Sequence, residues 1–501
     1  MDSKEKRQLI VIGNGFDRQC GLETTYDNYF NTRFGIKCTE EANKAFHRNT
    51  DIDDIQKDFY DNCKKVLTEI FKSKETKDSN LNIGDIINDV LSSFLLPLNK
   101  ELNNKINTKT NARQMPDVLL AYQKLLKRLA NRSKEILEAT YSKWDLIFLS
   151  AKVCLTLDPL AHWHDVETMI YRVVTWVLKD NPFKFEENYS ENNENEYFDK
   201  VFYGYEFNSD LKNSKTIFRR VINICFHQDA DVKSKDDLAI EMLDDLNNFE
   251  RNFAKFINDQ VNYEDDISRN KKDYLNSAKD LLKKLVFPNF EMLPDSVIID
   301  VLNFNYSLDE SDFLEKAIPN VYVNSWTNIH GIADYAKKSV QSSPPIFGID
   351  SHDIFPSRRG EGVDFNDPRI FFTKAYRLIN NHVNDIRNSS FQKNVDVITF
   401  MGHSLNKADY SYFETIFDMY DIFHSNVKLK FYYYKGYDMI SDLDDGKRKT
   451  TTKKSERATT KKIVNLLTTY GETLENEHGE NIVNKLMLEQ RLDVHVNPSL
   501  E

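Results

Sequence analysis

Glycine is scarce in this chain of 501 residues: there are 15, and only Gly84 and Gly204 lie between residues 39 and 286. Cysteine is scarcer still. The five cysteines are scattered and form no CxxC pair, a spacing that favours neither a disulfide framework nor a zinc module and is typical of a reducing compartment. No run approaches the ~20 apolar residues of a membrane helix, and residues 1–8 are charged and lack the apolar region of a signal peptide. These absences predict a cytoplasmic protein without a membrane segment.

Basic residues are fewer than acidic ones: 67 Lys and Arg against 79 Asp and Glu give a net charge of -12. Because an acidic body repels the phosphate backbone, we do not expect nucleic acid as a general partner. The 40% of apolar residues is enough for a sizeable core. The length exceeds what one core usually organises, so we expect two domains, or one domain with a large insertion.

The pattern of apolar residues changes twice along the chain. Leu9 to Ile12 is a short apolar run that stops at a glycine turn, which predicts a buried strand. From about residue 39 to residue 287 apolar residues recur at helical spacing, and we interpret this stretch as a helical insertion domain. After Pro288 short β-branched or aromatic runs alternate with helical stretches: Val297 to Phe304, Val321 to Val323, Ile346-Phe347, Val395 to Phe400 and Val427 to Tyr434.

Strand, crossover, strand is the signature of a parallel sheet. Because the first strand has no strand partner nearby in the sequence, the sheet must be assembled from both chain ends. The predicted fold class is therefore α/β, with a Rossmann-like parallel sheet formed by residues 1–38 and 288–440. Residues 441–501 should supply a polar, basic loop, then helices and a last strand at Leu492 to Val496 that pack on this core.

The strongest local motif is the strand that ends in Gly13-Asn14-Gly15-Phe16-Asp17 and is followed by Gly21. A Gly-x-Gly turn lets the backbone approach a pyrophosphate, whose charge is met by amide groups at the next helix start. An ordinary turn with two glycines remains an alternative, since Arg18 occupies the position of the third glycine of the dinucleotide fingerprint.

Three further motifs follow predicted strands. Asn305, within Phe304-Asn305-Tyr306-Ser307, is placed to contact a ligand at the strand end, or else only turns the chain. His330, followed by a glycine, could serve as a general base near a ribose hydroxyl or play a structural role. The turn Gly402-His403-Ser404 offers N–H and hydroxyl donors to a nucleotide, or is another ordinary turn.

In combination these motifs resemble the sirtuin-type NAD-binding fold. Gly13, Gly15 and Gly21 match the spacing of its first motif, and the other three motifs resemble its Asn-x-Asp, His-Gly and Gly-x-Ser-Leu elements. Some positions depart from that pattern: Asp17 stands where sirtuins carry Ser, Ser307 replaces an acidic residue, and Tyr26 replaces an arginine. The cysteine pairs of the deacylase zinc module are absent as well.

The similarity extends to the AbiH family of bacterial phage-abortive-infection proteins. Its hallmarks are matched by Ile12 to Asp17, Gly21 to Tyr26, Phe304 to Tyr306, Ile329 to Gly331 and Gly402 to Asp409. The resemblance implies an antiphage effector that consumes NAD⁺ as a substrate, without a metal, and that is restrained until infection. Asn305 and His330 would then be catalytic, and the cofactor-binding residues would be Gly13, Asn14, Gly15, Phe16, Asp17, Gly21, Tyr26, Gly402, His403 and Ser404.

Two alternatives stay open: a nucleotide-binding sensor that does not turn its ligand over, and a metal-dependent nuclease or nucleotide hydrolase using Asp17. We expect NAD⁺ or a related nucleotide as ligand, a homo-oligomer, and a phage-derived trigger or partner protein. Lys447 to Lys462 holds eight basic residues among threonines. We interpret it as a solvated loop, with contact to RNA, DNA or a phage component as the alternative.

Overall fold

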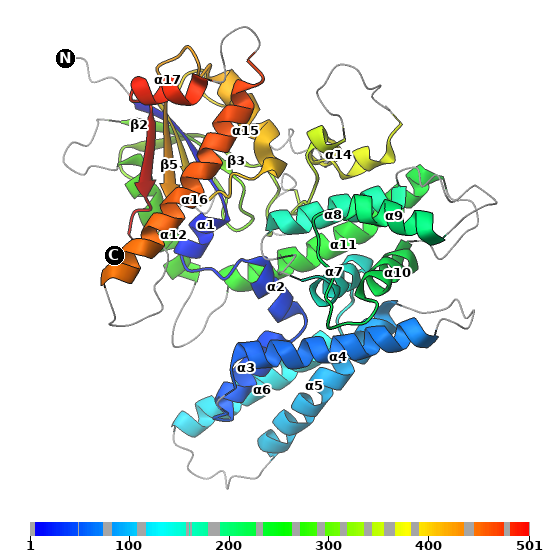
Figure 1. Ribbon diagram of the computed structural model, residues 1–501. Helices are drawn as coiled ribbons and strands as arrows, with labels where there is room; N and C mark the ends of the chain where they lie inside the picture. Colours follow the sequence, from blue (N-terminus) through cyan, green and yellow to red (C-terminus); the bar gives the residue numbers. More distant parts are fainter. Residues whose placement is uncertain are drawn as a thin grey trace. The chain divides into compact units, whose positions relative to one another are not determined.

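The computed structural model describes residues 6–48, 50–73, 83–107, 117–156, 160, 163–178, 191–226, 234–262, 271–287, 296–310, 318–334, 343–354, 366–381, 390–434, 445–474 and 481–499 (Figure 1). The chain divides into two compact units. The α/β unit comprises Met1–Thr24, Glu250–Val363 and Phe372–Glu501, and the helical unit comprises Thr25–Phe249 and Asp364–Phe371.

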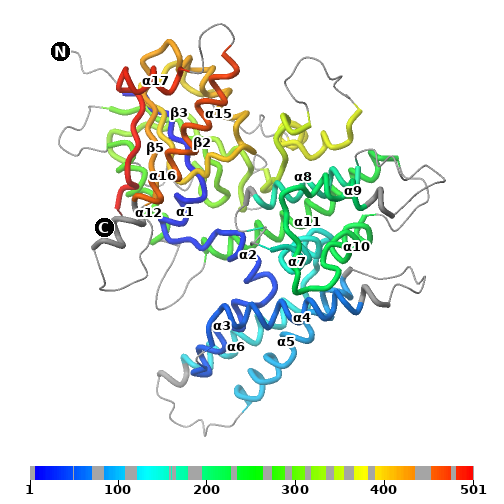
Figure 2. Tube along the Cα trace, in the orientation of Figure 1, coloured from blue at the N-terminus to red at the C-terminus, as the bar shows by residue number. Residues whose placement is uncertain are grey.

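The α/β unit is built on a six-stranded, entirely parallel sheet in the order β3-β2-β1-β4-β5-β6. Its strands are β1 (Lys6–Ile12), β2 (Val297–Asn303), β3 (Val321–Asn328), β4 (Val397–Met401), β5 (Lys428–Tyr433) and β6 (Leu492–Val496). The N-terminal strand β1 lies between β2 and β4, which come from the second half of the chain (Figure 2). The prediction of an α/β fold with a parallel sheet drawn from both chain ends is confirmed.

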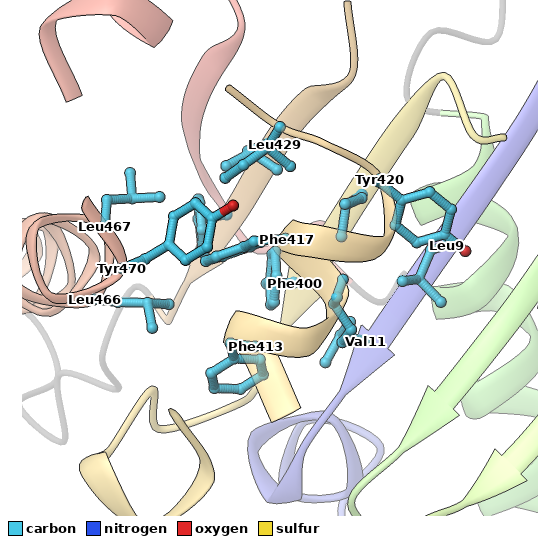
Figure 3. Close-up of a cluster of buried hydrophobic side chains, with 14 of the residues drawn as sticks. Leu9, Val11, Phe400, Phe413, Phe417, Tyr420, Leu429, Leu466, Leu467 and Tyr470 are labelled. Atoms are coloured by element: carbon cyan, nitrogen blue, oxygen red, sulfur yellow. The ribbon is translucent and has the colours of Figure 1, made fainter. Parts of the chain in front are cut away.

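Helices cover both faces of this sheet. On one face, α15 (Tyr410–Met419) and α16 (Asp445–Gly471) pack against β1, β4 and β5 (Figure 3). The buried side chains of this face include Leu9, Val11, Phe400, Phe413, Phe417, Leu429, Leu466, Leu467 and Tyr470. On the opposite face the side chain of Gln8 donates to the carbonyl of Val286 at the end of α12 (Lys271–Val286). Neighbouring residues of a strand point to opposite faces, so α12 covers the face that α15 and α16 do not.

The remaining helices of the α/β unit are short: α1 (Asn14–Gln19), α14 (Lys374–Asn380) and α17 (Ile482–Leu488), with single 3₁₀ turns at Ser351–Asp353 and Lys407–Asp409. The helical unit contains α2 (Tyr26–Arg33), α3 (Ile36–Ala45), α4 (Ile52–Ser73), α5 (Ile83–Asn107), α6 (Asp117–Leu137), α7 (Lys143–Cys154), α8 (Trp163–Leu178), α9 (Glu191–Val201) and α10 (Ser214–Phe226). No helix in the described part of the chain is long and apolar enough to cross a membrane.

The observed unit boundaries differ from the boundaries expected at residues 38 and 287. The first falls after Thr24, because the aromatic side chains of α2 pack among other rings of the helical unit. The second falls within α11 (Lys235–Val261), because α12 packs on the sheet. Helical spacing along the sequence does not reveal which core a helix joins.

Two local predictions are wrong. Ile346-Phe347 forms no strand; it is a buried loop in which the Ile346 N–H donates to the His330 carbonyl. The basic segment Lys447 to Lys462 is not a loop but part of helix α16. Lys, Arg and Glu are good helix formers, and the end of this helix is anchored in the core by Ile463 and Leu466.

Candidate functional site

All four sequence motifs emerge at the same edge of the sheet. Ile12 is in register with Asn303 of β2 and with Met401 of β4, and Asn303 is in register with Asn328 of β3. The residues that follow these strands therefore lie side by side at the carboxyl edge. The observed strand order is that of the doubly wound dinucleotide-binding folds, in which ligands bind at this edge, where the strand order reverses. Here that point lies between β1 and β4.

The turns after β1 and β4 interlock through three glycines. A Cβ on Gly13 would lie 2.6 Å from the His403 Cα, and one on Gly15 would lie 2.7 Å from the Gly402 Cα. Gly402 has φ +70°, and a Cβ there would lie 2.2 Å from the backbone nitrogen of Phe16. The Gly15 N–H donates to the Gly402 carbonyl over 2.8 Å. Close packing of two backbones thus accounts for these glycines, and the Gly15 amide already has a partner within the protein.

Most other residues assigned to nucleotide binding in the first turn are held by protein contacts. Phe16 is fully buried. The Asn14 amide donates to the Thr24 carbonyl over 3.1 Å and also accepts from the Thr24 hydroxyl. Gly21 ends α1, where its N–H donates to the Arg18 carbonyl. These residues shape the turn after β1.

Ser404 and Tyr26 occupy contrasting environments. Ser404 is exposed at the turn after β4, at the carboxyl edge of the sheet. Tyr26 belongs to the helical unit, where it is 1% exposed and its ring meets those of Tyr29 and Phe148. Burial raises the pKa of its hydroxyl well above the ordinary value. The contacts of Tyr26 within its own unit are those of a core residue.

Asp17 is buried beneath the carboxyl edge with two hydroxyl partners. The Tyr274 hydroxyl donates to its Oδ1 over 2.9 Å, and the Ser307 hydroxyl donates to its Oδ2. Burial raises the pKa of Asp17 from 3.8 to about 6, although Ser307 and Tyr274 favour the charged form. Asn305 stabilises that form less than either hydroxyl does. Near neutral pH this carboxylate can therefore take up and release a proton.

Asn305 is 2% exposed, and its amide lies close enough to Asp17 to favour the charged carboxylate, yet no hydrogen bond of normal geometry reaches its Nδ2 or its Oδ1 from the described residues. Its backbone is fixed: the Asn305 N–H donates to the Asn303 side-chain oxygen over 2.8 Å. The Asn303 amide in turn donates to the Leu308 carbonyl and to the Asn328 side chain. Buried amides without partners are rare because their desolvation is not compensated, so a rigid loop that presents one is typical of a ligand site.

His330 shows the same property. It is 5% exposed, its Nε2 has no hydrogen-bond partner among the described residues, and that atom lies 3.8 Å from the Asp409 Oδ1. Burial lowers the pKa of His330 from 6.5 to about 3, and the positive charge of Lys374 acts in the same direction, against Asp409. The imidazole is therefore neutral at neutral pH. It can exchange a hydrogen bond with a ligand, but it is a weak base.

A buried charged group lies next to His330. Lys374 donates to the Asp409 Oδ1 over 2.6 Å and to the Ala408 carbonyl over 3.2 Å. Burial alone would raise the pKa of Asp409, but Lys374 and His403 outweigh it and hold this pKa well below its usual range. The His403 Nδ1 accepts from the Leu405 N–H over 3.0 Å, and its Nε2 faces the Asp409 Oδ2 at 3.4 Å. The His403 side chain therefore helps to hold the Asp409 carboxylate in position.

Three residues of this site were missed in the sequence: Tyr274, Asn303 and Lys374. Tyr274 is 257 positions from Asp17 and lies in a helix of ordinary amphipathic pattern. Lys374 begins a short helix capped by Thr373, and a lysine in that position is normally solvated. Only Asn303 carried a local signal, as a polar residue at the end of an apolar strand. Long-range contacts bring the other two to the site.

Comparison with known proteins yields no match, whether by family model, by curated sequence or by solved structure.

Proposed function

We propose that this protein binds NAD⁺ at the carboxyl edge of its parallel sheet and hydrolyses it to nicotinamide and ADP-ribose, as an AbiH-like antiphage effector. The observation that carries the proposal is the pair Asn305 and His330. Both are buried at that edge, and both have side-chain polar atoms that no hydrogen bond of normal geometry reaches from the described residues. The doubly wound strand order and the motif resemblance support the choice of a dinucleotide.

In the proposed reaction water attacks C1′ of the nicotinamide ribose as the glycosidic bond breaks. The C–N bonding electrons leave with nicotinamide, the new C–O bond completes ADP-ribose, and one proton is released. The Asn305 amide would orient the ribose and the attacking water. The neutral His330 would hydrogen-bond a ribose hydroxyl, and Asp17, with a pKa near 6, is the better acceptor for the proton of the water.

Ser404 is exposed beside the Gly13 turn, and we assign to it the binding of the NAD⁺ phosphates. The rival in which Asp17 binds a metal is less well supported. A cation there would need several further oxygen ligands, whereas the two groups in contact with Asp17 are neutral hydroxyls that donate to it.

The test is release of nicotinamide from NAD⁺ by the purified protein, with and without phage lysate, followed by chromatography. Asn305→Ala and His330→Ala should each lower cleavage by roughly a hundredfold, because each removes a positioned group that acts on the reacting ribose. His352→Ala is the matched control, since His352 belongs to the same unit and its side chain is 46% exposed. It should cleave at the wild-type rate.

Binding by calorimetry and thermal melting separate the alternatives. Variants that melt and bind like the wild type but do not cleave support the catalytic assignment. A wild-type protein that binds NAD⁺ and never cleaves it is a sensor. A wild-type protein that does not bind NAD⁺ under either condition refutes the proposal.

A further inference from the structure

Helix α16 has two dissimilar faces. Its inner face ends in Ile463, Leu466, Leu467 and Tyr470, all buried in the core of the α/β unit. One and two turns earlier the inner positions are small and polar: Thr459 and Ser455 are half-buried, and the Ser455 hydroxyl donates to the Tyr434 carbonyl. These contacts fix the rotation of the helix about its axis, so its outer face is also fixed.

The outer face is a row of positive charge. Lys453, Arg457 and Lys461 are exposed and lie at successive spacings of four residues, with exposed Lys454 beside them. At a rise of 1.5 Å per residue, neighbouring charges of the row stand about 6 Å apart. Among the described residues none of these four side chains forms an ion pair. The row is unusual in a chain whose net charge is -12.

We propose that this face of α16 binds the phosphate backbone of double-stranded nucleic acid. A straight row of guanidinium and ammonium groups on a packed helix is complementary to a regular line of phosphates. Between residues 453 and 462 the only apolar residue is Ala458. Beyond Lys462 the same face carries one exposed apolar side chain, that of Val464, which is too little for the apolar stripe that a membrane-surface helix inserts. The row itself carries no aromatic ring on which single-stranded bases could stack. The surface should bind without sequence preference.

This inference is independent of NAD⁺ cleavage and is tested without NAD⁺. The triple variant Lys453→Gln, Arg457→Gln and Lys461→Gln removes three charges and keeps good helix formers on an exposed face, so its melting should match the wild type. The matched control substitutes Gln for Lys57, Lys212 and Lys255, which are exposed and scattered. Both variants have the same net charge.

Fluorescence anisotropy is measured with labelled duplex DNA, duplex RNA and single-stranded DNA over a range of salt concentrations. The wild type should bind at least one duplex with an affinity that falls steeply with salt, by a log–log slope of about -3 to -4. The triple variant should lose affinity at least about tenfold at low salt and reduce the slope by about 3, whereas the control should bind like the wild type. The two duplexes distinguish DNA from RNA as the source of the phosphates.

Three outcomes would overturn the proposal. The first is a wild type that binds neither duplex at about 50 mM salt, where non-specific binding is strong. The second is a triple variant that binds as well as the control. The third is stronger binding to anionic lipid vesicles or to an acidic peptide than to either duplex, which would assign the row to another partner.

Discussion

The stability of the α/β unit should depend on pH through His330, and one substitution can isolate the effect. Its pKa falls from 6.5 to about 3 on folding, so between these values the unfolded chain binds a proton that the folded protein does not. The contribution of His330 is therefore fully present above about pH 6.5 and is lost as the pH falls toward 3. One pKa unit corresponds to about 1.4 kcal/mol, so the loss between about pH 7.5 and about pH 4.5 is roughly 3 kcal/mol.

Asp17 acts in the opposite direction over the same range. Its pKa rises from 3.8 to about 6 on folding, so the folded protein binds the extra proton. That stability is present at low pH and is lost as the pH rises through about 6. Acidification from about pH 7.5 to about pH 4.5 should thus add roughly 2 kcal/mol from Asp17, and the two contributions nearly cancel in the wild type.

The assay is urea unfolding followed by circular dichroism at both pH values. Relative to the wild type, His330→Gln should gain roughly 3 kcal/mol on acidification, and Asp17→Asn should lose roughly 2 kcal/mol. Each variant is compared with itself at two pH values, so the packing cost of the substitution cancels. If the free energy of unfolding changed equally with pH in the wild type and in both variants, the shifted pKa values of His330 and Asp17 would be refuted.

Two further predictions concern packing. Gly402→Ala combines a left-handed backbone with a Cβ 2.2 Å from the Phe16 nitrogen, and it should cost several kcal/mol by thermal melting. Gly204→Ala is the control: Gly204 has φ +89°, but an added Cβ would meet no atom within 4 Å, so this substitution should cost only about 1 kcal/mol. If both substitutions destabilised the protein equally, the close packing of the turns after β1 and β4 would be contradicted. Lys374→Met leaves the buried Asp409 charge without its ammonium partner, and it should cost about 3–5 kcal/mol in the same measurement. Adding Asp409→Leu should restore part of that loss, and strictly additive losses would show that the pair is not coupled.

The sequence by itself determined the sheet and the edge at which the four motifs emerge. All six strands are recognisable as apolar or β-branched runs, although the run from Val321 to Val323 covers only the start of β3, and the helical stretches between several of them imply parallel pairing. Parallel strands place their carboxyl ends at one edge, so Gly13, Asn305, His330 and Gly402 had to emerge together. That conclusion needs only local patterns, because strand direction follows from the crossover connections.

Only the tertiary structure decided what surrounds each of those residues at the edge. Gly13 and Gly402 suit a phosphate turn in sequence, but a backbone hundreds of positions away fills the space beside them. The pKa of Asp17 depends on burial and on Tyr274, and the pKa of His330 depends on burial and on Lys374. No local sequence pattern marks Tyr274 or Lys374 as part of the site.

The basic segment of α16 was wrongly interpreted for the same reason. Its charges and threonines are typical of a solvated loop when taken alone, yet Ile463 and Tyr470 further along anchor a continuous helix in the core. Hydrogen-bond partners, burial and pKa values arise from contacts between residues that are distant in sequence. Periodicity and motif spacing describe only neighbours along the chain, and so they predict where a residue lies better than what surrounds it.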